Sequence, residues 1–455
     1  MTDITFDLAL IQKYNQSGPR YTSYPTALEF NENYSEQDFE TAAARYPERP
    51  LSLYVHIPFC HKLCYFCGCN KVITRHRHKA DIYLDFLEKE ISNRAPLFKN
   101  RTATQIHWGG GTPTYLSETQ SARLMNMLKT HFTIADDAEI SIEMDPREIE
   151  LSMLDHLRRI GFNRISMGVQ DFNKEVQKAV NREQDEDFIR ALLIRARELG
   201  FQSTNLDLIY GLPFQTVESF MFTLQKVIEL NPDRLSVFNY AHLPSRFAGQ
   251  VKIKDKDLPS PETKLSILQN TIETLGAAGY KFIGMDHFAK PDDELAIAQQ
   301  NGVLHRNFQG YTTQEECDLL GLGVSAISLL GDSYAQNQKE LKQYYADVDE
   351  KGIALHKGLT LTEEDCLRRD VIKALICNFK LDYAAVERQY HIDFTTHFAE
   401  DLALLKPLAE DGLLDIKPHG IVVSPKGRLL IRNICLCFDS YSRQQARRQQ
   451  FSRII

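Results

Sequence analysis

The sequence predicts an α/β fold in which a partial (β/α) barrel is followed by a smaller, mostly helical domain. The barrel is predicted because short strand-like runs alternate with helical runs from about residue 51 to about residue 287, the pattern of parallel strands with helices outside. Repeated single-strand units favour a barrel over a sandwich, and a doubly wound sheet is the alternative. Near the end of the chain, a helix, two short strands and another helix predict a winged-helix-like domain.

Seven strands are expected, each rich in β-branched and aromatic residues, with amphipathic helices between them. The clearest helix places Ile189, Leu192, Leu193 and Ala196 on one face and ends at Gly200. The expected strands are Leu51–Ile57, Thr104–Trp108, Glu139–Met144, Arg164–Val169, Ser203–Tyr210, Asp233–Tyr240 and Lys281–Phe288.

The chain divides by character into residues 1–45, 46–358 and 359–455. The first part has little periodicity and contains the proline- and aromatic-rich run SGPRYTSYPT, so we expect a segment packed on the surface of the barrel domain. A polar, glycine-punctuated stretch from Asp347 to Asp365 reads as a linker to the C-terminal domain.

Composition narrows the function. The net charge of −8 argues against binding of nucleic acid. The N-terminus carries Asp3 and Asp7 where a signal peptide would be basic and then apolar, and no apolar run approaches the length of a membrane span. We therefore expect a cytoplasmic protein with neither a membrane nor a nucleic-acid partner. Nine cysteines in a reducing compartment indicate metal binding or catalysis rather than disulfides.

Four of these cysteines stand together directly after the first expected strand. Cys60, Cys64, Cys67 and Cys69 have the spacing C-x3-C-x2-C-x-C. Thiolates this close in one loop can surround a compact inorganic cluster, and soft sulfur ligands suit iron and zinc. A closed zinc site of all four is the alternative, but zinc sites usually join two distant segments. The spacing favours an iron-sulfur cluster.

Polar and glycine residues follow the other expected strands, at the end of a barrel where catalytic groups gather. The second strand runs into Gly109, Gly110 and Gly111, which let a backbone approach a ligand closely. A carboxylate at such a junction more often caps the next helix, but together these side chains form a polar ring. The polar residues at or near the other strand ends are Glu143, Asp145, Gln170, Asp171 and Asp207.

The motif C-x3-C-x2-C after the first barrel strand resembles the signature of the radical S-adenosylmethionine superfamily. This resemblance implies a radical S-adenosylmethionine partial barrel with one 4Fe-4S cluster, whose metal ligands are Cys60, Cys64 and Cys67. The fourth iron is left for the amino and carboxylate groups of S-adenosylmethionine. A fourth protein ligand at Cys69 would block that position.

Further motifs are similar to those of the oxygen-independent coproporphyrinogen III oxidase family, namely SGPRYTSYPT, MDHFA, NFQGYTT and LGLGVSAIS. The resemblance covers essentially the whole chain and implies two molecules of S-adenosylmethionine. The implied catalytic residues are Tyr54, Cys69, Glu143, Phe308 and Gln309. The implied cofactor-binding residues are Tyr54, Phe66, Gly110, Gly111, Thr112, Glu143, Gln170, Arg182, Asp207, Ala241 and Ile327.

The activity implied by this resemblance is oxidative decarboxylation of two propionates of coproporphyrinogen III to vinyl groups in haem biosynthesis, through a 5'-deoxyadenosyl radical. The implied partners are this substrate, a flavodoxin- or ferredoxin-type electron donor and an unidentified electron acceptor, with the enzyme a monomer. The N-terminal segment would lie over the active site, where Arg20 could meet a propionate.

Two alternatives share the barrel and the cysteine motif: a haem chaperone and a porphyrin-modifying methyltransferase. In the chaperones an aromatic residue usually stands in the place of Cys69, and the N-terminal segment is missing. Both features of this chain therefore favour the oxidase.

Overall fold

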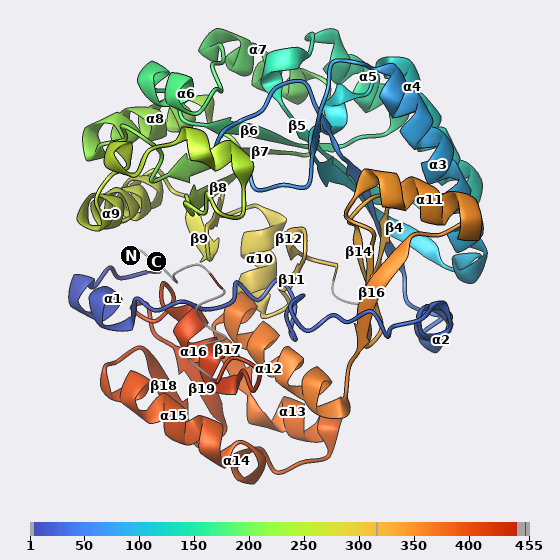
Figure 1. Ribbon diagram of the computed structural model, residues 1–455. Coiled ribbons are helices and arrows are strands. Elements are labelled where there is room, and N and C mark those ends of the chain that lie inside the picture. The colour runs from blue at the N-terminus through green and yellow to red at the C-terminus, as the bar shows by residue number, and fades with distance from the viewer. Residues whose placement is uncertain (1–3, 315–316, 444–450, 452–455) are drawn as a thin grey trace.

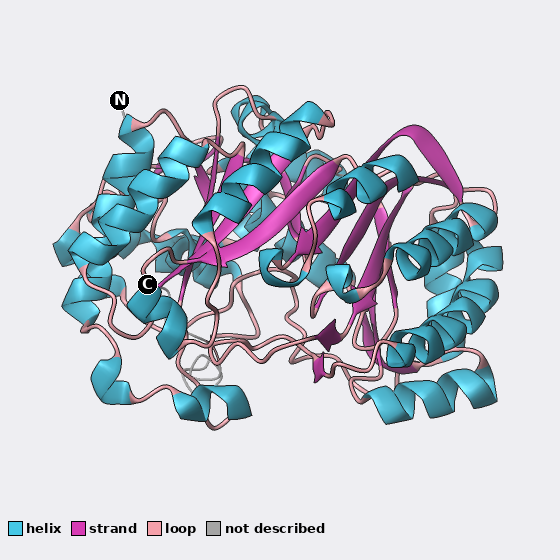
Figure 2. Cartoon of the chain, turned by 90° about the horizontal axis from the view of Figure 1, so that it is seen from above, coloured by secondary structure: helices cyan, strands magenta, loops and turns pink. Residues whose placement is uncertain are grey.

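The computed structural model describes residues 4–314, 317–443 and 451. A curved sheet with helices along its outer side forms the larger part of the molecule, and a smaller helical unit packs beneath it (Figure 1). Viewed from above, the helices lie outside the strands (Figure 2). Within these described ranges, none of the helices has the length and apolar character needed to cross a membrane.

The large sheet has the strand order β16-β15-β14-β13-β1-β4-β5-β6-β7-β8-β10-β9. From β1 to β8 each strand pairs in parallel with the next, and β13 is parallel to β1. The order never reverses, as it would in a doubly wound sheet, so the partial barrel is confirmed. The central strands are β1 (Leu51–Ile57), β4 (Thr102–Gly110), β5 (Thr133–Met144), β6 (Arg164–Gln170), β7 (Ser203–Tyr210) and β8 (Arg234–Asn239).

The strand expected from Lys281 to Phe288 is wrong as a single element. It is a tight antiparallel pair, β9 (Lys281–Gly284) and β10 (His287–Ala289), and β10 also runs antiparallel to β8. The chain reverses at Gly284 and Met285, whose φ angles are 148° and 53°. The reversal leaves Asp286 at a turn rather than inside a strand.

The outer helices pack on alternate residues of the barrel strands. In β1, Leu51, Leu53, Val55 and Ile57 are fully buried, and α7 buries the four apolar residues predicted for it. The outer helices are α3 (His78–Arg94), α4 (Glu118–His131), α5 (Ser152–Ile160), α6 (Lys174–Ala179), α7 (Glu186–Glu198), α8 (Val217–Leu230), α9 (Pro261–Ala277), α10 (Glu294–Asn301) and α11 (Leu341–Lys351).

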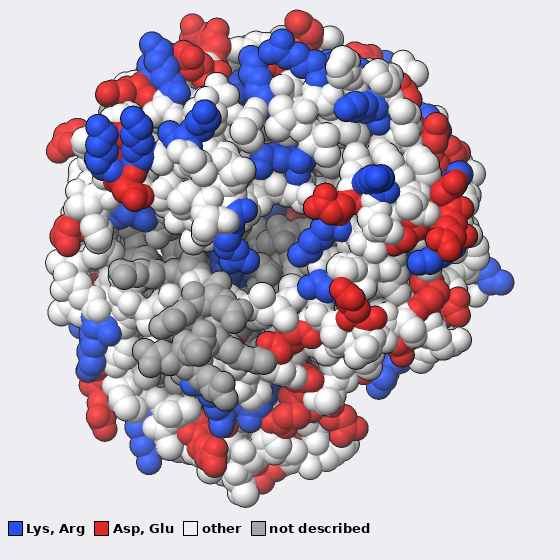
Figure 3. All heavy atoms as spheres, in the orientation of Figure 1, with Lys and Arg blue, Asp and Glu red and all other residues white. Residues whose placement is uncertain are grey.

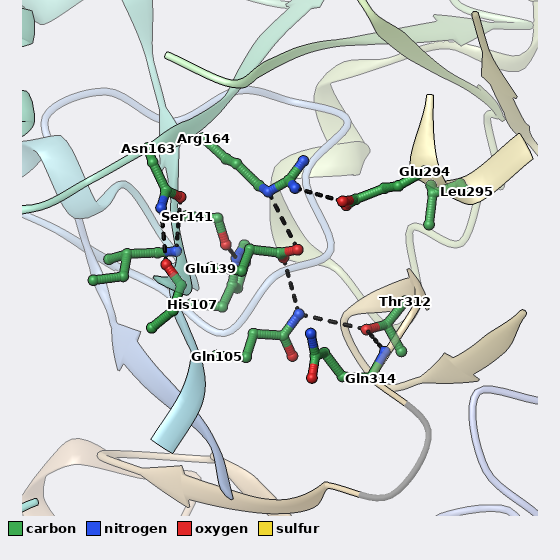
Figure 4. A network of polar contacts seen from close by, with 12 residues as sticks. Gln105, His107, Glu139, Ser141, Asn163, Arg164, Glu294, Leu295, Thr312 and Gln314 are labelled. Carbon is green, nitrogen blue, oxygen red and sulfur yellow. Dashed lines mark hydrogen bonds and ion pairs between the residues drawn. The ribbon is translucent and has the colours of Figure 1, made fainter. Parts of the chain in front are cut away.

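The opposite face of the same strands carries polar side chains that contact one another across the sheet (Figure 4). Ser52 donates a hydrogen bond of 2.7 Å to Gln105, and Gln105 donates one of 2.9 Å to Glu139. Arg164 pairs with Glu139 at 3.2 Å and with Glu294 at 2.7 Å. Because successive strand residues point to opposite faces, the barrel has a polar inner face.

The C-terminal unit has the predicted winged-helix-like order and one extra strand, β17. Its three strands pair in the order β17-β19-β18. The elements are α12 (Glu363–Asn378), β17 (Lys380–Asp382), α13 (Tyr383–Tyr390), α14 (Phe394–His397), α15 (Ala399–Glu410), β18 (Leu414–Lys417), β19 (Gly420–Val423) and α16 (Ile431–Phe438).

The prediction that residues 347–365 form a linker is wrong for the middle part of that stretch. It contains β16 (Leu355–Thr360), which pairs with β15 (Ser333–Asn337) at the edge of the large sheet next to β14 (Ile327–Leu330) and β13 (Asp318–Leu322). The boundary expected between residues 358 and 359 therefore falls inside a strand. Polar residues suit an edge strand as well as a linker, which is why composition misled.

The N-terminal segment carries α1 (Leu8–Tyr14) and α2 (Glu36–Arg45) and runs between the two units, as the dark blue chain in Figure 1 shows. Its second half packs on the barrel domain as expected, where the hydroxyl of Tyr34 lies 2.6 Å from the hydroxyl of Ser333. Its first half also contacts the C-terminal unit, through Tyr21 and Tyr24, which are 5% and 2% exposed. The Tyr21 hydroxyl donates to Asp439 at 3.0 Å, and the Tyr24 hydroxyl lies 2.9 Å from that of Ser440. Each ring fills apolar space while its hydroxyl keeps a polar partner.

A buried ion pair joins the start of β13 to the chain just before β4. Asp318 and Arg101 are 2.9 Å apart with side chains 2% exposed, and Asp318 also accepts from the amide of Gly331 at 2.9 Å. Removal of one partner would leave the other charge buried and uncompensated.

We predict that Asp318→Ala lowers the free energy of unfolding by about 3 to 5 kcal/mol, measured by urea denaturation. As a matched control, Asp349 pairs with Lys89 in solvent, so Asp349→Ala should change stability by no more than about 1 kcal/mol. Equal effects of the two substitutions would contradict the role assigned to the buried pair.

Candidate active site

The four clustered cysteines lie on a loop at the barrel mouth, the end where the central parallel strands have their C-terminal ends. The loop connects β2 (Phe59–Cys60) to β3 (Val72–Ile73), two short strands that pair in parallel. The amide of Thr74 donates to the carbonyl of Cys60 at 3.0 Å. This pairing folds the loop back on itself beside the end of β1. Cys64 is buried, whereas Cys69 is exposed.

Hydrogen-bond donors point at the cysteine sulfurs. The Thr112 hydroxyl lies 3.3 Å from the sulfur of Cys60, and guanidinium groups of Arg147 and Arg182 lie 3.2 and 3.3 Å from that of Cys64. A hydrogen bond from the thiol of Cys69 lowers the pKa of the Cys67 thiol. Donors of this kind stabilise thiolates, the form that binds metal.

The loop suits a cluster better than a single metal ion. Among the residues that the structure describes, no three His, Cys, Asp or Glu side chains are arranged to hold one ion. A 4Fe-4S cluster asks for a different arrangement, because each cysteine binds a separate iron. The chemistry and spacing of Cys60, Cys64 and Cys67 suit a 4Fe-4S cluster. The arrangement of the described side chains does not suit a zinc ion held by all four cysteines.

Asp145 holds the two arginines in place. It pairs with Arg147 at 2.6 Å and with Arg182 at 3.2 Å. Although burial favours the neutral acid, the charges of Arg182 and Arg147 lower the pKa of Asp145 to about 2. The carboxylate is therefore ionised at neutral pH and orients both guanidinium groups toward the cysteine loop.

Glu143 ends β5 beside the glycine run. Its carboxylate accepts from the amide of Gly110 at 3.1 Å and lies 3.3 Å from His107 Nε2. A Cβ atom on Gly109 would lie 2.9 Å from the same carboxylate, so any other residue there would displace the Glu143 side chain from this position. Burial opposes ionisation, but His107 and the Gly110 amide outweigh it and lower the pKa of Glu143. With its side chain 45% exposed, this carboxylate is open to a cationic ligand group.

Tyr54 stands next to Glu143 with two histidines that the sequence did not single out. Its ring stacks on His107 with centroids 5.9 Å apart, and its hydroxyl lies 3.1 Å from His56 Nδ1. The alternation of polar and apolar residues in Leu51–Ile57 and Thr104–Trp108 puts these histidines on the inner face. That alternation is the signal that could have found them.

Asp207 on β7, Gln170 at the end of β6 and Arg182 in the loop between α6 and α7 form a second group of polar residues. Asp207 lies within β7 and accepts from Asn205 at 2.8 Å, so it does not cap a helix. Burial and the charge of Glu143 raise the pKa of Asp207 to about 6. Gln170 has a φ of 69°, and its buried Oε1 has no partner. An orphaned acceptor beside a carboxylate suits a ligand with hydroxyl or amino donors.

Asp171 does not belong to the polar ring. It is 1% exposed and accepts from the amide of Asn173 at 2.6 Å, the side chain of Thr223 at 2.7 Å and Gln215 at 2.5 Å. These contacts fix the start of α6 against α8. The N-cap of α6 is Asn173, whose side chain accepts from the amides of Glu175 and Val176. Asp171 therefore has a structural role in holding that cap rather than capping the helix itself.

The remaining predicted residues lie in two further places. Phe308 and Ile327 share an apolar cluster with Tyr334, whose ring meets that of Phe308 edge-on at 5.8 Å. Phe308 and Gln309 occupy the turn between β11 (His305–Asn307) and β12 (Gly310–Thr312).

Phe66 and Ala241 lie close to each other. Their carbonyls both accept from the amide of Gln250, at 2.9 and 3.3 Å. None of the interactions found in the described residues joins Phe308 or Gln309 to the cysteine loop.

Comparison with known proteins defines the class. A model of the Radical SAM superfamily matches residues 54–227, which span the cysteine loop and β1 to β7, and a model of the HemN C-terminal domain matches residues 361–430. The chain is a radical S-adenosylmethionine protein by fold and by site.

Full-length relatives define the family. The chain is 72% identical over 452 residues to the oxygen-independent coproporphyrinogen III oxidase of Escherichia coli, covering 99% of each chain, and 51% identical to that of Pseudomonas aeruginosa, covering 99% of each. A solved structure titled as coproporphyrinogen III oxidase (HemN) from Escherichia coli, a radical SAM enzyme, matches with a TM-score of 0.94 and 70% identity, covering 97% of this chain and 100% of that one. The chain belongs to the oxygen-independent coproporphyrinogen III oxidase family.

We predict that Cys64→Ser, reconstituted anaerobically, loses the visible absorbance of a 4Fe-4S cluster, because one of three ligands is missing. Cys69→Ser should keep that absorbance, since Cys69 is not expected to bind iron. Equal loss in both variants would contradict the assignment of the three ligands.

We predict that Asp207→Asn weakens S-adenosylmethionine binding by about 10- to 100-fold, the value of a charge-assisted hydrogen bond. Because the pKa of Asp207 is raised to about 6, wild-type affinity should fall as the pH drops through 6, and the variant should lose this dependence. Titration calorimetry at pH 5 to 8 measures both.

Stability separates this binding role from a structural one. Because the pKa of Asp207 is raised to about 6 in the folded protein, ionised Asp207 lowers the free energy of unfolding above about pH 6. Below the pKa of the unfolded chain this cost is absent. Asp207→Asn should therefore not lower stability at pH 7. Asp171→Ala is the control, expected to destabilise the fold because it leaves the buried donors of Asn173, Gln215 and Thr223 without their acceptor, while S-adenosylmethionine affinity is kept. The reverse pattern would show that Asp207 is structural.

Proposed function

We propose that this chain catalyses the oxygen-independent oxidative decarboxylation of two propionate side chains of coproporphyrinogen III to vinyl groups, giving protoporphyrinogen IX. The observation that carries the proposal is the 72% identity over 99% of the chain to an enzyme of that name. The polar barrel mouth, with its cysteine loop and ionised Glu143, supports it.

The cofactors we propose are one 4Fe-4S cluster on Cys60, Cys64 and Cys67 and two molecules of S-adenosylmethionine. When bound, they supply an electron and the radical chemistry that removes hydrogen from the substrate. The ionised, half-exposed carboxylate of Glu143 suits the ammonium of the first molecule, and Gly109 to Gly111 leave room for it. Asp207, Gln170 and Arg182 suit the second.

The other predicted site residues have roles that their positions support. Tyr54, held by His107 and His56, would fix the cluster-bound molecule from the side of β1. Phe308 and Ile327 give an apolar wall, which excludes water from a reactive site. Cys69 is exposed and is free of iron in this proposal, so its thiol can serve the substrate instead.

A basic segment supports an acidic electron donor of the flavodoxin or ferredoxin type. Residues 61–80 contain five Lys or Arg and no Asp or Glu, in a chain of net charge −8. Residues 75–79 are exposed, and the Thr74 amide bonds to the carbonyl of Cys60. Complementary charge steers such an encounter. The five basic residues are Lys62, Lys71, Arg75, Arg77 and Lys79.

We predict that the anaerobic protein, given S-adenosylmethionine, a strong reductant and an electron acceptor, releases two molecules of carbon dioxide per coproporphyrinogen III. The check is trapped carbon dioxide together with protoporphyrin after oxidation, and Cys64→Ser is the inactive control. A protein that releases none, but binds haem tightly and passes it to an apoprotein, would be a haem chaperone. Removal of residues 1–30 would not test the role of the N-terminal segment in catalysis cleanly. It takes away buried Tyr21 and Tyr24, which contact the C-terminal unit, and so it would also disturb the fold.

A further inference from the structure

A cavity of about 460 Å³ opens between the N-terminal segment, the barrel and the C-terminal unit. It begins at the ends of β7 and β8, where Tyr210 and Ala241 line it, and so it adjoins the barrel mouth. Figure 3 shows Lys and Arg side chains around a hollow near the centre of this face. The charged groups that line the cavity within the described residues are Arg20, Lys264, Asp286 and Arg432.

Positive charge exceeds negative charge here. Arg20, from the N-terminal segment, pairs with Asp286 at the turn between β9 and β10. Arg432, from α16, donates to the carbonyls of Pro19, at 2.7 Å, and Gly18. Of the described lining residues, Asp286 alone is acidic. One carboxylate therefore faces several cations.

A third arginine, Arg306, lines a neighbouring pocket rather than this cavity, and its charge adds to the field at Arg20. The guanidinium of Arg306, on β11, lies over the ring of Tyr311, 5.0 Å from the ring centroid. Two of its nitrogens, Nε and Nη1, are buried and have no hydrogen-bond partner. The pKa of Arg20 is lowered to about 10, mainly by burial and to a smaller extent by the charge of Arg306. Burial and the charge of Arg20 lower the pKa of Arg432 to about 9. The guanidinium groups repel one another, so an added anion would be stabilised.

The walls between these cations are largely apolar. Leu268, Phe282, Phe288 and Leu429 line the cavity. An apolar pocket with a few convergent charges suits an organic anion with a large hydrophobic body. The substrate of the proposed reaction is of that kind, a macrocycle with four propionates, of which two remain in the product.

We infer that Arg20, with Arg306 and Arg432 beside it, binds the propionate carboxylates that the enzyme leaves unreacted. This inference rests on the proposed function, which supplies the substrate. Arg20 can form two parallel hydrogen bonds with a carboxylate. In the free enzyme the carboxylate of Asp286 pairs with Arg20. When the substrate enters, its carboxylate displaces Asp286 or shares the Arg20 guanidinium with it. The site fixes which two side chains stay away from the reacting centre.

The test measures binding of oxidised, unreactive porphyrins by fluorescence quenching. Arg20→Met should weaken coproporphyrin III by about 10- to 100-fold and protoporphyrin IX by a similar factor, since both carry the unreacted propionates. Affinity for coproporphyrin III tetramethyl ester, which has no charge, should not change. Lys13→Met is the matched control, because Lys13 lies on the same segment and pairs with Asp411 outside the cavity.

Two further variants separate binding from folding. Arg306→Met should also weaken the binding of both porphyrins. Asp286→Asn should strengthen that binding, because it removes the competing carboxylate. Arg20→Lys should recover part of the affinity. Cluster absorbance and S-adenosylmethionine binding serve as checks that each variant is folded.

The outcomes distinguish the inference from the function. If folded Arg20→Met and Arg306→Met keep wild-type affinity for coproporphyrin III and an unchanged KM, the carboxylate site is wrong while the function stands. Weakened binding of coproporphyrin III alone would assign the arginines to the reacting propionates and overturn the inference. If the wild-type protein neither binds coproporphyrin III nor releases carbon dioxide, the proposed function itself fails.

Discussion

The two-residue period of the parallel strands is the constraint on which the rest of the molecule depends. One set of alternate side chains, such as Leu53 and Val55, must be apolar because the outer helices cover it. The other set faces the barrel interior and can be polar only where each group finds a partner, since an unpaired buried group is costly. The contacts from Ser52 through Gln105 and Glu139 to Arg164 meet that requirement.

The same interior becomes more open and more highly charged toward the barrel mouth. Asp145 neutralises Arg147 and Arg182 and directs them at the sulfur of Cys64. Glu143 is ionised and half-exposed, whereas Asp207, close to it, has a pKa raised to about 6 and so takes up a proton at a pH only slightly below neutral. Two carboxylates with separated pKa values in one cleft are characteristic of a functional site rather than a structural network. The cysteine loop and this pair of acids thus belong to one electrostatic unit.

Local patterns predicted the fold well. The strands Leu51–Ile57 and Ser203–Tyr210 have the expected bounds, because a buried parallel strand is a continuous β-branched and aromatic run. The pair β9 and β10 was missed because its reversal depends on the φ angles of Gly284 and Met285, which composition does not reveal. β16 was taken for a linker because an edge strand tolerates polar residues.

The candidate site was predicted where its residues stand in a compact motif or at a strand end, as with Cys60 and Glu143. Arg432 and Arg306 were missed because they lie hundreds of residues from Arg20 in the sequence, and only the folded chain brings the three charges near one another. Asp171 was grouped with the ring because a carboxylate buried in a structural hydrogen-bond network and a ligand-binding one look alike in sequence.

The hydrogen bonds from Arg432 on α16 to the carbonyls of Gly18 and Pro19 join the N-terminal segment to the C-terminal unit. A ribosome synthesises the first of these segments more than 400 residues before the second, since the two carbonyls and the guanidinium are 413 and 414 positions apart. Until α16 leaves the exit tunnel, Gly18 and Pro19 lack the side chain to which their carbonyls bond. The cavity lined by Arg20 and Arg432 therefore forms only after α16 has been synthesised, later than the barrel strands that line its other side.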